Sequence, residues 1–129
     1  MIVDSSAIVA IIRQEPEAAE FARTIAQNGC RLSAVNYVEA AVVIDSVRDA
    51  VVSRKFDELI RESEISIEPV TESQARIARE AYRDFGKGSG HPAQLNFADC
   101  FAYALAKDFA EPLLFKGRDF SQTDLTPAL

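Results

Sequence analysis

The chain has 129 residues, so we expect residues 1–129 to form a single domain around one hydrophobic core. Hydrophobic residues make up 48% of the chain and charged residues 26%, which is ordinary for a soluble globular protein. The formal net charge of −6, taken alone, argues against a nucleic-acid-binding protein, because such proteins usually carry a basic excess. There is no apolar run near the roughly 18 residues of a membrane span and no basic signal-peptide start, so we expect a cytoplasmic protein with no membrane association.

The first third of the chain alternates short apolar runs with helical patterns. Residues 1–3 predict a buried strand, and the helix that follows begins at Ser5 or Ser6 and runs to residue 12. Pro16 opens a second helix at 15–17, which we expect to end in a C-cap at 28–29. A second strand is predicted at 30–33, and Ser33 is predicted to cap a nearly all-apolar helix over 34–44.

The same alternation continues to the end of the chain. The predicted elements there are, in order, an amphipathic helix at 51–64, a strand at 65–70, a helix at 72–85, a glycine-rich loop at 86–92, an apolar helix at 95–106, a strand at 112–115 and a short edge strand at 125–126. The side chains expected to point inward from the helix at 72–85 are Ala75, Ile77, Ala78, Ala81 and Tyr82. Strands alternating with helices indicate an α/β fold, here three layers (α/β/α) around a central parallel sheet of four to five strands.

Two of the apolar helices carry an acid three residues after an asparagine. Glu39 follows Asn36 in the helix at 34–44, and Asp99 follows Asn96 in the helix at 95–106, where Tyr103 is predicted to share the face of Asp99. A buried ionised carboxylate must be neutralised, paired or bound to a metal. A polar helix edge that reaches water explains one such acid well and both acids less well.

Two further acids lie just beyond the ends of predicted strands. Asp4 comes after the first strand and Asp119 shortly after the strand at 112–115. Their simplest roles are a helix N-cap for Asp4 and a turn residue for Asp119. Parallel strands end at one edge of a sheet, where ligands of such folds bind, and the helices with Glu39 and Asp99 begin near that edge. We therefore expect all four carboxylates to converge there.

Four converging carboxylates predict a site for a hard divalent cation, Mg²⁺ or Mn²⁺. His91 is the only histidine, which excludes a multi-histidine metal site, and neither Cys30 nor Cys100 is a candidate nucleophile. This favours metal-assisted hydrolysis of a phosphodiester by water. Setting aside four carboxylates gathered in one site takes the formal charge from −6 to −2, which weakens the argument against a nucleic-acid substrate. The loop at 86–92 is not a P-loop; it is either a plain linker or a carrier of Lys87 and His91 toward a polyanion.

The chain resembles the PIN-domain ribonucleases, and among them the VapC toxins of bacterial toxin–antitoxin pairs. The resemblance covers essentially the whole chain and is carried by Met1-Ile2-Val3-Asp4-Ser5-Ser6-Ala7, by Glu39 in its apolar helix, by Leu95-Asn96-Phe97-Ala98-Asp99-Cys100, and by Leu114-Phe115-Lys116-Gly117-Arg118-Asp119-Phe120. It implies a PIN-like domain whose acids bind Mg²⁺ or Mn²⁺ and cleave single-stranded or looped RNA.

Carried over residue by residue, the resemblance assigns roles to specific positions. The acidic, catalytic and metal-binding set would be Asp4, Glu39, Asp99 and Asp119, with Asn96 and Ser6 as auxiliary polar residues and Lys87, His91, Lys116 and Arg118 as candidate RNA contacts. Arg118 stands where the family often has an acid or Asn, so this corner of the site is less acidic. The resemblance also implies a homodimer and a cognate VapB-like antitoxin.

The main alternative is a catalytically silent PIN-like module that binds RNA or protein. A phosphoacceptor signalling domain fits less well, because Asp45 and Asp57 lie in predicted helices rather than at the end of a central strand. A haloacid-dehalogenase-type phosphatase needs a second Asp two residues after Asp4, where this chain has Ser6.

Overall fold

The computed structural model describes all 129 residues. In chain order its elements are β1 (Ile2–Val3), α1 (Ser5–Ile12), α2 (Ala18–Ala26), β2 (Arg31–Ser33), α3 (Ala34–Asp45), α4 (Ala50–Glu62), β3 (Ser66–Glu68), α5 (Glu72–Phe85), α6 (Phe97–Phe109), β4 (Leu113–Leu114) and a 3-10 turn (Phe120–Gln122). No helix is long and apolar enough to cross a lipid bilayer.

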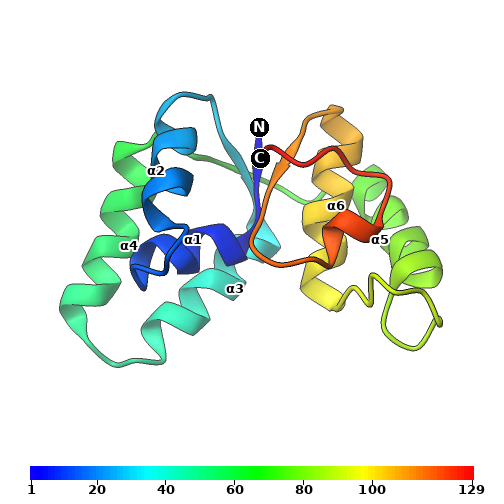
Figure 1. Cartoon of the computed structure of the whole chain (residues 1–129), viewed down its shortest axis with the longest axis horizontal. Helices are drawn as coiled ribbons and strands as arrows, with labels where there is room; N and C mark the ends of the chain where they lie inside the picture. Colours follow the sequence, from blue (N-terminus) through cyan, green and yellow to red (C-terminus); the bar gives the residue numbers. More distant parts are fainter.

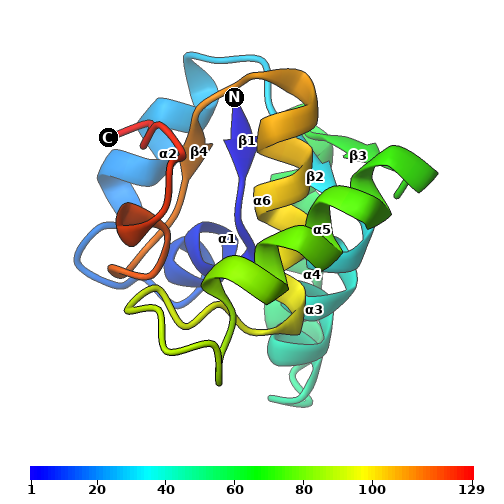
Figure 2. The ribbon, with the colours of Figure 1, turned by 90° about the vertical axis from the view of Figure 1, so that its right-hand side faces the viewer.

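The four strands form one parallel sheet in the order β3-β2-β1-β4. β1 lies in the middle, with Ile2 opposite Arg31 of β2 on one side and Leu113 of β4 on the other. All strands therefore end at one edge of the sheet, and Figure 2 shows α1 and the loop before α6 at the end of the molecule toward which β1 points. The predicted parallel sheet is confirmed.

Alternate strand residues point to opposite sides of the sheet, and helices cover both of these faces. Ile2 and Leu113 pack into a core with α5 and α6, whereas Val3 and Leu114 pack into a second core with α1 to α4. Figure 1 shows these two helical layers on either side of the strands. The expected three-layer α/β/α architecture is thus confirmed.

Two expectations about element ends are wrong. α2 ends at Ala26 with Gln27 as its C-cap, one residue before the expected 28–29, and Asn28 adds a bond from its Nδ2 to the Thr24 carbonyl at 2.7 Å. The strand expected at 125–126 is only a bridge, in which Leu113 bonds to Thr126 and Ala128 on either side of Pro127. No further backbone hydrogen bond joins this segment to β4, so the pairing does not extend into a ladder.

The inward face of α5 is narrower than predicted. Gln74, Ala78 and Ala81 are buried against α6, whereas Ala75 and Tyr82 are exposed. The stripe at 74, 78 and 81 meets small α6 side chains, so the two helices pack closely and leave Tyr82 at the margin of their contact.

Candidate active site

Asp4 stands directly after β1 and is 3% exposed. It is both the N-cap of α1 and a candidate site residue: its Oδ2 accepts a hydrogen bond from the Ser6 N–H at 3.0 Å, while its Oδ1 is buried and has no hydrogen-bond partner. Burial raises the pKa of Asp4 to about 7 against the opposing hydrogen bonds from Ser6, and the charges of Asp99 and Glu39 raise it further. The site thus contains a buried carboxylate oxygen that nothing in the protein satisfies.

Asp99 lies in the first turn of α6, where it completes a capping box. Its Oδ2 accepts from the Asn96 N–H at 3.0 Å, and Asn96 Oδ1 accepts from the Asp99 N–H at 2.9 Å. Burial raises the pKa of Asp99 to about 6, the Asn96 N–H opposes this rise, and the nearby charges of Glu39 and Asp119 add to it. Asn96 is therefore a cap that orients Asp99 as well as an auxiliary polar residue.

Glu39 is half-buried on α3 and is held by two side chains. Ser5 donates a short hydrogen bond from its hydroxyl to Glu39 Oε1, and Asn36 Nδ2 lies 3.4 Å from the same oxygen. Sequence reasoning assigned no site role to Ser5 or Asn36. The spacing of Asn36 three residues before Glu39 was a usable signal, whereas nothing in the sequence distinguished the role of Ser5 from that of Ser6.

Asp119 is exposed and precedes the 3-10 turn, and none of its side-chain oxygens makes a hydrogen bond in the protein. Its charge nevertheless acts on Asp99. Ser6 links this loop to α1, because its Oγ accepts a hydrogen bond from the Lys116 N–H at 3.0 Å. Asp119 thus lies at the open side of the same edge.

The four candidate RNA contacts fall into two pairs. Lys116 binds Glu15 at 2.5 Å and a second glutamate of the turn between α1 and α2, and His91 packs edge-on against Phe85 while its Nδ1 accepts from a backbone N–H. The side chains of Lys116 and His91 are therefore engaged in contacts within the protein. Lys87 and Arg118 are exposed and form no ion pair, and the charge of Lys87 acts on Asp99.

The acids are close enough to influence one another but do not form a tight cage. Charge coupling joins Asp4 to Asp99 and Glu39, and joins Asp99 to Glu39 and Asp119. No three Asp, Glu, His or Cys side chains lie close enough together to share one ion. Mg²⁺ is commonly bound through one or two carboxylates with waters completing its shell, so a donor set centred on Asp4 and Asp99 fits it.

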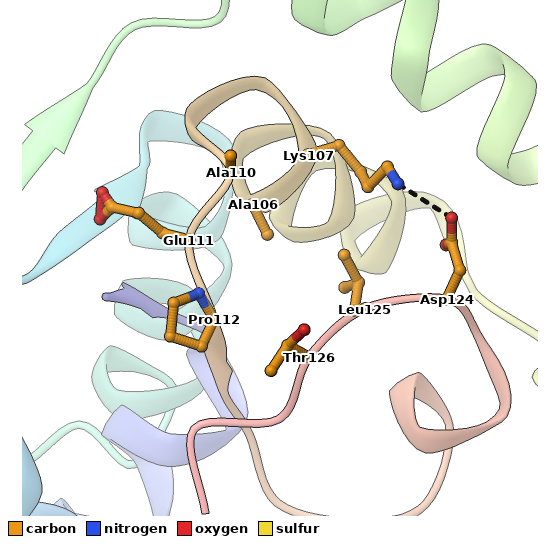
Figure 3. A pocket seen from close by; sticks show the side chains of 8 residues that line it. All are labelled: Ala106, Lys107, Ala110, Glu111, Pro112, Asp124, Leu125 and Thr126. Atoms are coloured by element: carbon orange, nitrogen blue, oxygen red, sulfur yellow. Dashed lines mark hydrogen bonds and ion pairs between the residues drawn. The ribbon is translucent and has the colours of Figure 1, made fainter.

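A hollow of about 460 Å³ lies at the opposite end of the sheet and holds none of these acids (Figure 3). Its charged side chains are already paired: Lys107 bonds to Asp124 at 2.9 Å, and Glu111 bonds to the amino group of Met1 at 2.7 Å. Tyr103, predicted to share a face with Asp99, instead donates its hydroxyl proton to Asp124 at 2.7 Å. This hollow lacks the chemistry of the acidic edge.

The fold and the acidic edge define the class of protein. The family model described as "PIN domain" matches residues 1–125. Ribonuclease VapC28 of Mycobacterium tuberculosis is 59% identical over 130 residues, covering 100% of this chain and 98% of that relative. Ribonuclease VapC42 of the same species is 46% identical over 129 residues, covering 99% and 98%. The chain therefore belongs to the VapC ribonucleases of the PIN-domain family.

A solved structure agrees with this assignment at the level of the fold. The crystal structure of Mycobacterium tuberculosis VapC20, described as a Sarcin-Ricin loop cleaving toxin, superposes with a TM-score of 0.75. The match covers 97% of this chain and 95% of that chain at 15% sequence identity. At that identity the likeness concerns the architecture alone.

Proposed function

We propose that this chain is an endoribonuclease that hydrolyses RNA phosphodiester bonds with the help of Mg²⁺ or Mn²⁺. We propose further that it acts in the cytoplasm as the toxin of a toxin–antitoxin pair. Membership of the VapC ribonucleases supports the reaction class. The observation that carries the metal dependence is the buried, unpartnered Oδ1 of Asp4 beside the charges of Asp99 and Glu39. Such an oxygen is costly unless a cation or proton neutralises it.

Asp4 and Asp99 would hold the cation, with Glu39 and Asp119 near enough to add negative charge. When bound, the ion lowers the pKa of water and neutralises charge that develops on the phosphodiester. The chain's own residues fix the acids in place: the capping box orients Asp99, and the Ser6 N–H orients Asp4. Exposed Lys87 and Arg118 flank the acids from two loops and would attract the phosphates of the RNA.

The partners we propose are a VapB-like antitoxin and a second copy of this chain. The antitoxin is proposed on the resemblance to VapC toxins that the sequence motifs carry. The homodimer is supported by a face over α3, α5 and α6 on which Phe97 is 72% exposed. Phe97 is one of the side chains that line an apolar groove of about 280 Å³ between α5 and α6, together with Ala78, Tyr82, Phe101 and others. A protruding ring next to a groove that can receive one is self-complementary, as a two-fold symmetric interface requires.

One observation favours the alternative of a catalytically silent module. No three acids stand close enough to share an ion. A silent module would bind RNA or protein without cleaving it, and neutralising its acids would leave binding intact.

The deciding experiment is cleavage of a single-stranded RNA in Mg²⁺, in Mn²⁺ and in EDTA. We expect EDTA to stop cleavage by the unmodified chain. We expect Asp4→Asn and Asp99→Asn to lower its rate by at least about 100-fold while retaining the helical circular-dichroism signal. The matched control is Asp57→Asn, an exposed acid on α4 outside the acidic set, which should cleave at the unmodified rate.

Either of two results would contradict this proposal. Undiminished activity in EDTA would remove the metal from the mechanism. Equal behaviour of all three Asp→Asn variants would mean that Asp4 and Asp99 do not take part, in favour of the silent module.

A further inference from the structure

Asn36 is fully buried in the first turn of α3, and both hydrogen-bond contacts of its amide group reach the site. Its Nδ2 lies 3.0 Å from the carbonyl oxygen of Ala98, which is 62 residues further along the chain, and 3.4 Å from Glu39 Oε1. Ala98 is the residue before Asp99 in the first turn of α6. One side chain therefore contacts a candidate acid and the helical turn that carries another.

The other half of the same amide has no partner. Asn36 Oδ1 is buried and accepts no hydrogen bond in the protein. Leaving such an atom unsatisfied costs roughly 1–3 kcal/mol, and an apolar side chain of similar size would avoid that penalty. Asn is also a poor residue inside a helix. Packing alone thus gives no reason for this residue, whereas the two contacts of its Nδ2 do.

The unsatisfied atoms gather at the candidate site. The only three buried side-chain oxygens or nitrogens without a partner are Asp4 Oδ1, Ser33 Oγ and Asn36 Oδ1. The parallel register places Ser33 beside Asp4, since Ile2 pairs with Arg31 two residues earlier in each strand. Elsewhere in the interior, the buried amide of Gln74 is bonded to Asp108 at 3.0 Å. Buried side-chain polar atoms without a hydrogen-bond partner therefore occur only at the acidic edge.

We propose that Asn36 is a positioning residue of the acidic site. Its amide group holds the carboxylate of Glu39 and ties the start of α3 to the start of α6, so that Glu39 and Asp99 keep a fixed relation to each other. This inference rests on the proposed function, because a fixed relation between Glu39 and Asp99 matters only if the acidic site binds a cation.

The test is Asn36→Leu, which removes the amide and keeps the number and branching of the side-chain heavy atoms. Because it also removes the unsatisfied Oδ1, we expect the thermal midpoint to stay unchanged or rise. We expect the affinity for Mn²⁺, measured by titration calorimetry on the metal-free chain, to fall by about 10- to 100-fold, as for other residues that orient metal ligands.

Gln74→Leu is the matched control, because it removes a buried amide that ties α5 to α6 away from the acids. It should bind Mn²⁺ within twofold of the unmodified chain, whatever its thermal midpoint. Unchanged Mn²⁺ affinity in Asn36→Leu would overturn the inference, and so would a parallel loss in Gln74→Leu, which would indicate general loosening.

A second measurement works without any metal. In the metal-free chain, amide hydrogen exchange should be faster in Asn36→Leu at residues 97–101, with α5 unchanged. An unmodified chain that binds no Mn²⁺ would overturn the proposed function, while the exchange rates would still decide whether Asn36 holds α6. Unchanged exchange at residues 97–101 would overturn that tie.

Discussion

At the scale of single residues, the most consequential group is Asp4, whose burial raises its pKa to about 7 in the folded chain. In the unfolded chain the pKa is close to 3.8. The folded state therefore binds this proton more tightly, and stability must fall as the pH rises from about 4 through 7. The loss is of the order of 4 kcal/mol at most, since one pKa unit corresponds to about 1.4 kcal/mol.

We accordingly expect Asp4→Asn to raise the free energy of unfolding of the metal-free chain, and to raise it more at pH 8 than at pH 5. Asparagine keeps the N-cap of α1, so the cap does not mask the effect. Urea unfolding in EDTA at the two pH values measures it. Asp84→Asn is the control, because Arg83 lowers the pKa of that exposed carboxyl and the substitution should give no gain at pH 8. An equal gain from Asp4→Asn at both pH values would mean that its carboxyl is not held protonated.

At the scale of elements, the capping box makes the start of α6 both a structural and a chemical feature. Asn96→Ala removes the side-chain acceptor for the Asp99 N–H and should cost about 1 kcal/mol of stability. It should also slow cleavage, because Asp99 loses one of the two hydrogen bonds of the capping box that hold it in place. Asn96→Ser can restore the cap and should restore both properties. Urea unfolding and the RNA cleavage rate measure the two effects.

A substitution at the cap of α5 separates the effect of a lost cap on stability from its effect on cleavage. Thr71 caps α5 through a bond from the Gln74 N–H at 3.1 Å, so Thr71→Ala should lose similar stability and no activity. If Asn96→Ala lost only stability, the cap would have no part in positioning Asp99.

The elements could be located from the sequence because each depends on local pattern. The apolar runs and caps identified β1, α1, α3 and α6 to within a few residues. The pairing of Asn96 with Asp99 was noticed, but it was interpreted as a shared helix face. The same three-residue spacing also fits a capping box, and only the helix start at Phe97 decides between them.

The site was predictable only where topology dictates it. Asp4 follows β1, so its place at the edge of a parallel sheet follows from strand order alone. The contact between Asn36 and Ala98 depends on how closely α3 and α6 pack, which is a tertiary distance that no local pattern contains. The engagement of Lys116 by Glu15 is likewise a contact between loops 101 residues apart.

At the scale of the whole molecule, the exposed face over α3, α5 and α6 is a feature that the fold of a single chain leaves unexplained. Phe97, Val38 and Val42 are among its most exposed large apolar side chains, and Figure 2 views α5 and α6 from this side. If two copies pair through it, each Phe97 ring enters the groove of the other copy. Phe97→Asp would then place a charge in an apolar contact and should shift the chain from dimer to monomer.

Sedimentation velocity at micromolar concentration measures that shift. Val51→Asp is the control, because Val51 is an exposed apolar residue on α4, outside the proposed face, and its substitution should leave the dimer intact. An unmodified chain that sediments as a monomer, or a Phe97→Asp chain that stays dimeric, would remove this face as the dimer interface. Because Phe97 lies one residue before Ala98 and two before Asp99, pairing through it would also bring the start of α6, and with it the acidic edge, close to the symmetry axis.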